Sequence, residues 1–226
     1  KITLLEEPQA AFYHYLYANG LSVENPANLQ PGDQILVCDI GGGTSDFTLI
    51  EYADKGLRRV AVGEHLMLGG DNLDISLAYL VEPRLGSKLD ILQWGVLRNE
   101  CRRAKELLLG DDPPDKVTVT VPGSGSKLLA GTMQADLSRT EVEKLVLDGF
   151  FPVVPIEEPL QAERRMGFKE WGLPYASDPA VPRHLSSFLR RHGRKDNIPN
   201  KILFNGGACR ALAIRQRMLH ILENWR

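Results

Sequence analysis

The residues best suited to chemistry form one run, Asp39-Ile40-Gly41-Gly42-Gly43-Thr44-Ser45-Asp46. A phosphate group needs several N–H donors that converge on a small volume, and consecutive glycines let the backbone aim its N–H groups inward with no Cβ in the way. Thr44 adds a hydroxyl donor. Asp39 could hold Mg²⁺ through its water ligands, because Mg²⁺ prefers oxygen and dehydrates reluctantly, and Asp46 is a possible second metal contact. The run predicts a phosphate cradle; the alternative is a glycine-rich tight turn.

Two further glycine pairs precede predicted helices. Gly206-Gly207 lies between a strand and a helix, where backbone N–H groups and the helix dipole favour an anion or a close ligand approach. Gly69-Gly70 is placed in the same way. Neither pair has the GxxxxGKS/T or the GxGxxG spacing, so the sequence lacks the fingerprint of a P-loop or of a Rossmann dinucleotide site.

The elements that must position these glycines follow from apolar patterning and from turn and cap residues. Short β-rich runs predict strands at 35–39, 47–52, 57–62 and 201–204, and a hairpin of 117–121 with 128–133. Helical spacing and caps predict helices at 7–17, 71–81, 91–108, 138–147 and 182–192, and a last helix whose face carries Leu212, Met218, Leu219 and Leu222. The Pro-rich segment 150–182, which includes Trp171 and Tyr175, is expected to be irregular, with the two aromatic residues serving either a partner surface or local core packing.

Composition excludes several classes of function. A formal net charge of −2 gives no electrostatic attraction to nucleic acid or to an anionic membrane, so neither is an expected partner. No apolar run approaches the roughly 18 residues of a membrane span. Cys38, Cys101 and Cys209 are far apart and form no CxxC pair, which favours buried thiols in a reducing compartment over disulfides or zinc.

Five motifs, in order, resemble those of the DnaK-type (heat-shock-seventy) chaperone family. The family carries EPTAA, DLGGGTFD, LGGEDFD, CERAK and VGGSTR. This sequence has EPQAA at 7–11, DIGGGTSD at 39–46, LGGDNLD at 68–74, CRRAK at 101–105 and NGGACR at 205–210. The glycine turn alone would fit any actin-like ATPase, sugar kinases included, whereas the first and third motifs favour the chaperone branch. The Pro-rich segment departs from the usual chaperone and suggests a divergent bacterial member.

The resemblance implies an α/β fold, namely one lobe of a ribonuclease-H-like, actin-like ATPase with an inserted α+β subdomain. Residues 1–70 would form the first part of a nucleotide-facing subdomain, and residues 199–226 would add its last strand and helix. Residues 71–198, which contain the Pro-rich segment 150–182, would form the inserted subdomain.

The resemblance also implies ATP or ADP with Mg²⁺ as cofactors, and it assigns roles to individual residues. Glu7 would help to position the attacking water, and Asp39 would act on the Mg²⁺–water shell and on catalysis. The phosphate contacts would be Gly41, Gly42, Gly43 and Thr44. The nucleoside end would comprise Gly69, Gly70, Arg102, Lys105, Gly206, Gly207 and Arg210, with the last packing near the adenine.

The adenosine end departs from the family pattern ERAKRTLS. Lys105 is kept, but Arg102 replaces the acid, Glu106 replaces an Arg and Leu109 replaces the Ser. Ala208 also replaces the Ser of GGSTR. Arg102 and Glu106 are four residues apart and could pair with each other. These changes predict altered adenosine affinity or selectivity beside an intact phosphate end. Taken without the resemblance, Lys105 fits a solvated helix face.

Several parts of the family's site are absent from this sequence: the first phosphate loop DxGTT, the catalytic Lys and the closing motif near the last helix. We therefore expect a fragment that covers the second lobe of the ATPase domain and has little or no turnover alone. Its implied partners are the first lobe of the parent protein and co-chaperone or client proteins, in a bacterial cytoplasm. The alternatives are a non-hydrolysing nucleotide sensor, an interaction module and a small-molecule kinase of the same superfamily.

Overall fold

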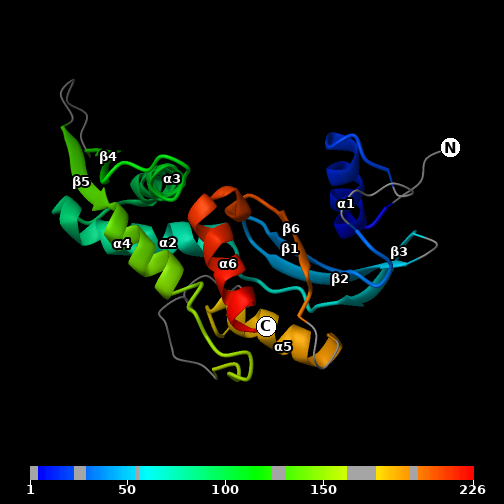
Figure 1. The fold of residues 1–226 in the computed structure, drawn as a ribbon. Helices are drawn as coiled ribbons and strands as arrows, with labels where there is room; N and C mark the ends of the chain where they lie inside the picture. Colours follow the sequence, from blue (N-terminus) through cyan, green and yellow to red (C-terminus); the bar gives the residue numbers. More distant parts are fainter. Residues whose placement is uncertain (1–4, 23–28, 54–55, 124–130, 162–176, 194–197) are drawn as a thin grey trace.

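A mixed α/β fold with two sheets is seen in the computed structural model, which describes residues 5–22, 29–53, 56–123, 131–161, 177–193 and 198–226 (Figure 1). The larger sheet has four strands in the order β3 (Gly56–Val62), β2 (Ser45–Ala53), β1 (Gln34–Ile40) and β6 (Lys201–Asn205). Strands β1, β2 and β3 pair antiparallel, and β6 pairs parallel to β1. The C-terminal strand thus lies directly beside the strand that leads into the glycine turn.

Helices pack on both faces of the four-stranded sheet, which explains why β1 is apolar along nearly its whole length. Ile35 and Val37 pack with Phe12 and Leu16 of α1 (Glu7–Ala18). The alternate residues of β1 point into the main core, which also receives side chains from α5 (Val181–His192) and α6 (Leu212–Asn224). The central strand is therefore held from both sides, and its carboxyl end is fixed where the glycine turn begins.

The second sheet is a hairpin of β4 (Lys116–Pro122) and β5 (Thr132–Ser138), covered by helices. Along β4, Val117, Val119 and Val121 are buried in alternation, as expected of a strand with one covered face. Helix α3 (Ile91–Leu108) packs against β4, and η1 (Glu82–Leu85) and α4 (Arg139–Glu143) pack against β5. Helix α2 (Gly70–Val81) packs on α3, and the π-helical turn η2 (Lys144–Asp148) continues α4.

The cap residues place the helix starts close to where the sequence predicts them. Ser138 caps α4, and the Glu141 carboxylate accepts a hydrogen bond from the Ser138 backbone N–H at 2.9 Å. Helix α2 begins one residue before the predicted Asp71, because Asn72 caps it from inside the first turn by accepting the N–H of Gly69 at 2.8 Å. At the start of α3, Asp90 accepts the Gln93 backbone N–H at 2.8 Å, and the Gln93 side-chain oxygen accepts the Asp90 backbone N–H at 3.0 Å.

The predicted second strand of the hairpin, 128–133, is wrong in position. The observed strand β5 runs to Ser138, because Ala135 and Leu137 alternate inward opposite β4 and Lys116 pairs with Ser138. Residues 128–130 lie outside the described part of the chain, as do Trp171 and Tyr175, whose predicted roles remain predictions.

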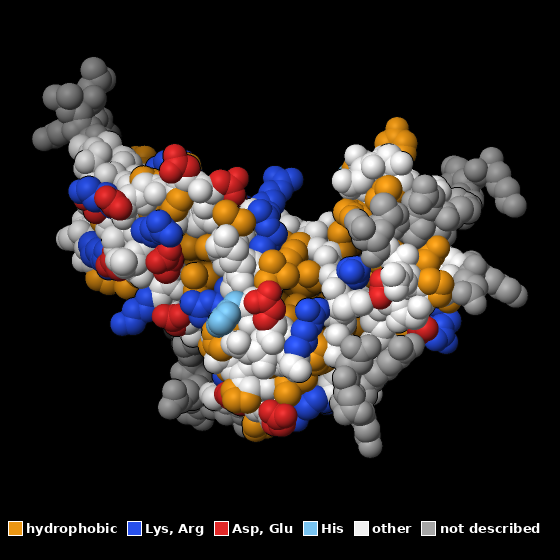
Figure 2. Space-filling model, viewed as in Figure 1, with side chains coloured by type: hydrophobic (Ala, Val, Ile, Leu, Met, Phe, Trp, Pro, Cys, Tyr) orange, Lys and Arg blue, Asp and Glu red, His pale blue; other side chains and the backbone are white. Residues whose placement is uncertain are grey.

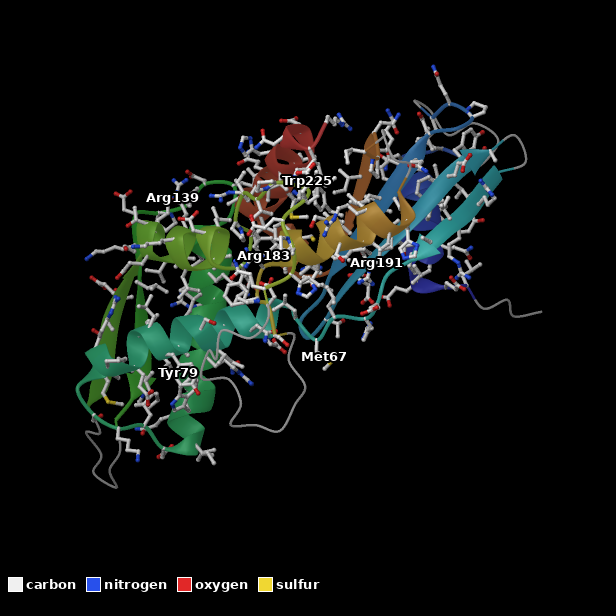
Figure 3. The ribbon with its side chains drawn as sticks, turned by 90° about the horizontal axis from the view of Figure 1, so that it is seen from below. Met67, Tyr79, Arg139, Arg183, Arg191 and Trp225 are labelled. Atoms are coloured by element: carbon white, nitrogen blue, oxygen red, sulfur yellow. The ribbon has the colours of Figure 1, made fainter. Side chains whose placement is uncertain are left out.

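Buried polar contacts hold the segment that follows residue 150, and Figure 3 labels two of the residues that make them, Arg183 and Trp225. Trp225, at the end of α6, donates its indole N–H to the Val154 carbonyl at 2.7 Å. Arg183 of α5 donates to both carboxylate oxygens of Asp178, at 2.7 and 2.9 Å. Burial alone would raise the pKa of Asp178, but the hydrogen bonds from Arg183 and from two backbone N–H groups hold it below its usual value. Such contacts give the Pro-rich region a defined path where it is described.

The three cysteines are buried free thiols, as predicted. Burial raises the pKa of Cys101 to about 12. The pKa of Cys38 is raised well above its ordinary value by the contact of Cys38 with Cys209 and by burial. Because the thiolate is the reactive form, we expect Ellman's reagent at pH 8 to label none of the three thiols in the native chain within minutes. All three should react in concentrated urea. Fast stoichiometric labelling in native buffer would contradict this packing.

The surface carries charges of both signs. On the face shown in Figure 2, Lys and Arg side chains are interspersed with Asp and Glu. Among the described residues, no helix combines the length and apolar character needed to cross a membrane.

Candidate functional site

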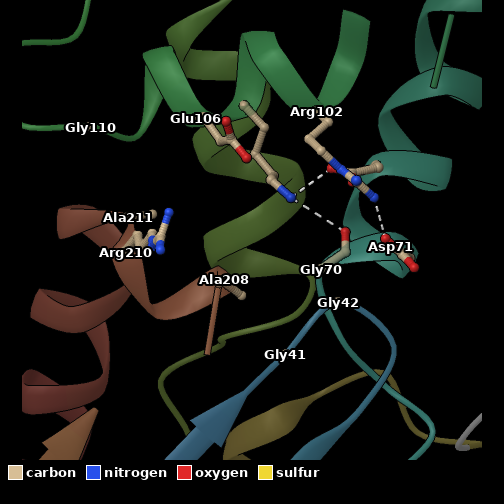
Figure 4. A pocket seen from close by; sticks show the side chains of 13 residues that line it. Gly41, Gly42, Gly70, Asp71, Arg102, Glu106, Gly110, Ala208, Arg210 and Ala211 are labelled. Atoms are coloured by element: carbon tan, nitrogen blue, oxygen red, sulfur yellow. Dashed lines mark hydrogen bonds and ion pairs between the residues drawn. The ribbon is translucent and has the colours of Figure 1, made fainter. Parts of the chain in front are cut away.

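A pocket of about 530 Å³ lies where the glycine turn, the start of α2, α3 and the 3₁₀ turn η4 (Ala208–Arg210) come together (Figure 4). Half of the predicted site residues line it, although they come from four separate parts of the chain. These are Gly41, Gly42, Gly70, Arg102, Lys105, Gly207 and Arg210.

The glycine turn presents unused backbone donors. The Gly41 N–H donates across the turn to the Thr44 carbonyl at 2.8 Å, and the carbonyls of Gly41 and Gly42 accept the N–H groups of Gly70 and Asp71 at 2.9 and 2.7 Å. Within the described chain, the N–H groups of Gly42, Gly43 and Thr44 donate to no protein acceptor. The carbonyls of the turn are therefore tied to α2, while three successive N–H groups remain available.

Two glycines are required because the turn is packed so closely. A Cβ on Gly69 would lie 2.6 Å from the Gly42 carbonyl oxygen and 2.8 Å from the Thr44 nitrogen. Gly206 has φ +83°, and a Cβ there would lie 2.3 Å from the Ile40 carbonyl oxygen. Gly69 and Gly206 thus act as spacers that let two neighbouring segments touch the glycine turn.

The two aspartates of the motif are directly opposite each other on β1 and β2, in the pair Asp39↔Asp46. Like charges at opposed positions of an antiparallel pair repel. Each is partly compensated: Asn205 donates its amide to Asp39 at 2.7 Å, and Asp46 contacts His65 Nδ1 at 2.6 Å. In the described chain, no cluster of three or more His, Cys, Asp or Glu side chains could hold a metal ion directly.

Asp74 is the site residue that sequence reasoning leaves unassigned. Its side chain is fully buried, and its two carboxylate oxygens accept hydrogen bonds from Lys105 Nζ at 2.6 Å and from Arg102 Nε at 2.7 Å. Lys105 also reaches the Gly70 carbonyl, at 3.4 Å. The last Asp of the segment LGGDNLD is the one signal that could have identified it.

Two predictions about α3 are corrected by this network. Arg102 does not pair with Glu106: its guanidinium contacts Asp74 and Asp71, because α2 lies against α3 and offers two carboxylates. The hydrogen bond to Asp74 raises the pKa of Arg102 above its ordinary value. Lys105 is no solvated helix-face lysine either, since only 6% of the residue is exposed.

The remaining predicted residues lie outside the pocket lining. Six of them belong to the glycine turn or pack beside it without lining the pocket: Asp39, Gly43, Thr44, Asp46, Gly69 and Gly206. Glu7 is exposed in the first turn of α1. Of the residues thought to alter the adenosine end, Ala208 and Glu106 line the pocket, whereas Leu109 is 1% exposed and belongs to the core.

Comparison with known proteins agrees with this arrangement. The family model described as "Hsp70 protein" matches residues 4–161. A chaperone protein HscA homolog of Acinetobacter baumannii is 32% identical over 114 residues, which cover 49% of this chain and 17% of that protein. The corresponding protein of Acinetobacter baylyi is 32% identical over 108 residues (47% and 16%). A heat shock protein 70 homolog of Acanthamoeba polyphaga mimivirus is 31% identical over 127 residues (53% and 13%).

The matched part of this chain thus spans 13–17% of the length of these relatives. The family match itself covers more than half of the chain and includes the glycine turn, the start of α2 and all of α3. The chain belongs to the Hsp70 protein family.

Proposed function

We propose that this chain is the nucleotide-binding second lobe of an Hsp70-type ATPase, and that it supplies the second phosphate loop and part of the adenosine site for ATP or ADP with Mg²⁺. The observation that carries the proposal is the glycine turn, in which the N–H groups of Gly42, Gly43 and Thr44 donate to no acceptor in the described chain. A phosphate would fill these donors. The turn is held in place by α2, so the donors are fixed before any ligand arrives.

The opposed carboxylates of Asp39 and Asp46 fit a cation at the same end. A Mg²⁺ ion with its water shell would relieve their repulsion, and Asp39 would contact it through water. We assign Glu7, in the first turn of α1, to the attacking water, as the family resemblance implies. Gly69 and Gly206 contribute by letting their segments pack closely on the glycine turn. The nucleoside end is formed by Gly70, Arg102, Lys105, Gly207 and Arg210.

The finer fold assignment is part of the same proposal: a ribonuclease-H-like, actin-like lobe with residues 71–198 inserted between 1–70 and 199–226. Strand β6 pairs directly with β1, although the hairpin sheet β4–β5 lies between them in the sequence, and this pairing supports the division. Helix α5, although within 71–198, packs back on the larger sheet through Phe188 and Phe47, whose ring centroids are 6.1 Å apart. The first lobe of the parent, co-chaperones and clients are the partners that the proposal implies.

The proposal predicts Mg²⁺-dependent nucleotide contacts without turnover. Added Mg²⁺–ATP should shift the amide ¹⁵N–¹H resonances of Gly42, Gly43 and Thr44, and Asp39→Ala should remove the Mg²⁺ dependence of those shifts. Steady-state ATP hydrolysis by the chain should be absent, because the first phosphate loop and the catalytic Lys are not in the sequence.

Asp33→Ala is the matched control. Asp33 accepts a hydrogen bond from Asn200 at 2.7 Å, just as Asp39 does from Asn205, but at the opposite end of β1 and β6. It should leave the nucleotide shifts unchanged. No shift in the glycine turn would overturn the proposed nucleotide site, and hydrolysis that disappears in Asp39→Ala would overturn the expected lack of turnover.

A second function, a non-hydrolysing nucleotide sensor, is favoured by Arg102. A guanidinium offers a ribose hydroxyl no acceptor, and two of its donors already bind Asp71 and Asp74. Calorimetry and a turnover assay on the complete two-lobed protein separate the two functions, since ATP binding without hydrolysis supports the sensor.

A further inference from the structure

We propose that Asp74 is a positioning residue of the nucleotide site, and that its buried carboxylate holds the Lys105 ammonium where an oxygen of the nucleotide can accept a hydrogen bond from it. The inference rests on the proposed nucleotide-binding function and adds to it a residue that the family resemblance leaves unassigned. It depends on the contacts of Asp74, on the donor that Lys105 has left and on where the ammonium lies.

Asp74 holds two cations of α3 with one carboxylate. Its side chain is 1% exposed, and its two oxygens accept hydrogen bonds from Lys105 Nζ at 2.6 Å and from Arg102 Nε at 2.7 Å. Arg102 also binds a second acid, Asp71. Among the described residues, Lys105 has only the Gly70 carbonyl, at 3.4 Å, as its other acceptor. The position of Lys105 therefore depends on Asp74 more strongly than that of Arg102 does.

Lys105 has one donor left for a ligand. An ammonium carries three N–H donors and no acceptor, and the described residues offer it two acceptors, Asp74 and the Gly70 carbonyl. The residue is buried, yet it lines the pocket. The third N–H is therefore available to an acceptor inside the pocket.

The ammonium lies beside the glycine turn. A Cβ placed on Gly70 would lie 3.6 Å from Lys105 Nζ and 3.8 Å from the Cα of Gly42, so the ammonium and the turn flank the same point. Figure 4 shows Gly42 and Gly70 next to each other where the turn meets α2. A nucleotide whose phosphates occupy the turn would bring a phosphate or a ribose oxygen close to this ammonium.

A lysine side chain contacts a ligand well only when its long stem is ordered. The stem is flexible, and ordering it during binding lowers the affinity. Asp74 orders Lys105 in the folded chain before a ligand arrives, so less ordering is left for the binding step. This is the contribution that we assign to Asp74.

The test is a double-mutant cycle in which Mg²⁺–ADP is titrated into the ¹⁵N-labelled chain and followed through the amides of Gly42, Gly43 and Thr44. Asp74→Asn keeps the shape of the side chain and removes its charge, and we expect the Kd to rise about tenfold. In Lys105→Met, which has no ammonium to position, adding Asp74→Asn should change the Kd by less than about twofold. An unchanged Kd in Asp74→Asn, or an equal rise in both backgrounds, would overturn the positioning role and leave the nucleotide site standing.

Adenosine and Mg²⁺–pyrophosphate distinguish the two kinds of oxygen that Lys105 could meet. Adenosine has the ribose without phosphates, and pyrophosphate has the phosphates without ribose. The compound that reaches the ammonium should bind more weakly to Asp74→Asn than to the parent chain. If neither compound loses affinity, Asp74 does not position Lys105 for the nucleotide.

Asp178→Asn is the matched control for the loss of a buried carboxylate. The Asp178 side chain is 2% exposed and binds Arg183 through both oxygens, at 2.7 and 2.9 Å, and neither residue lines the pocket. This variant should lose stability, as Asp74→Asn does, while its Kd for Mg²⁺–ADP stays unchanged. A similar rise in Kd in both variants would mean that a general loosening of the fold, and not the position of Lys105, explains the effect.

A measurement on the parent chain serves if Asp74→Asn does not fold. The Lys105 ammonium is shielded from water, so it should give its own ¹⁵N–¹H signal in the free chain, and Mg²⁺–ADP should shift that signal. An ammonium whose protons exchange as fast as those of exposed lysines, or whose signal ADP leaves unmoved, would contradict the proposal. If ADP shifts no amide of the glycine turn, the proposed function fails together with this inference.

Discussion

Asp74→Ala is expected to lower the free energy of unfolding by about 3–5 kcal/mol, the cost of breaking a buried ion pair by removing one partner. Asp74 is 0% exposed and Lys105 is 6% exposed. Without the carboxylate, the Lys105 ammonium keeps only the Gly70 carbonyl at 3.4 Å. Since a domain is stable by only about 5–15 kcal/mol, much of the chain's stability should be lost. Urea unfolding followed by far-ultraviolet circular dichroism measures the change.

Asp71→Ala is the matched control for Asp74→Ala. Asp71 lies one turn earlier on α2 and contacts the same Arg102, but its side chain is 46% exposed and that of Arg102 is 44% exposed. Solvent screens such a pair, so its loss should cost less than about 1 kcal/mol. Equal destabilisation by the two substitutions would show that burial of the Lys105–Asp74 pair is not what stabilises this region.

A double replacement separates the charge from the shape. Asp74→Leu with Lys105→Met removes both buried charges together, and apolar groups in place of a buried ion pair often cost little. The double variant should therefore be more stable than Asp74→Ala.

The sequence predicts well those features that neighbouring residues decide. The run 35–39 reads as a buried strand because its own residues are almost all apolar. Ser138 with Glu141 opens a helix because each satisfies a backbone N–H at the helix start. The glycine turn is also a local feature, because three consecutive glycines join one β-rich run directly to the next. These features need no knowledge of how distant elements pack.

The charged network of the pocket could not be predicted in this way. Along α3, Arg102 and Glu106 have helical spacing that suits a pair, yet Arg102 turns to α2 because Asp71 and Asp74 lie on the facing side of that helix. The burial of Lys105 has the same origin. Which charged residue finds which partner depends on the packing of α2 against α3, and helical spacing within one element does not contain that information.

Gly206→Ala is expected to destabilise the chain by about 2–5 kcal/mol, the combined cost of a left-handed backbone at a non-glycine residue and of overpacking. The new Cβ would lie 2.3 Å from the Ile40 carbonyl oxygen and 2.6 Å from Asp39 Oδ1. Backbone atoms cannot move aside as a flexible side chain can, so β6 must shift away from β1. That shift would also separate the Asn205 amide from Asp39. Urea unfolding measures the cost.

Gly207→Ala distinguishes this steric cause from a general need for glycine before η4. A Cβ on Gly207 meets nothing within 4 Å, and its φ of −64° is one that alanine adopts freely. Its free energy of unfolding should therefore stay within about 0.5 kcal/mol of the parent value. If the two substitutions were equally tolerated, the close packing of Gly206 on the end of β1 could not be what fixes Asp39 beside the glycine turn. If only Gly206→Ala is destabilising, the position of that carboxylate depends on the absence of one Cβ.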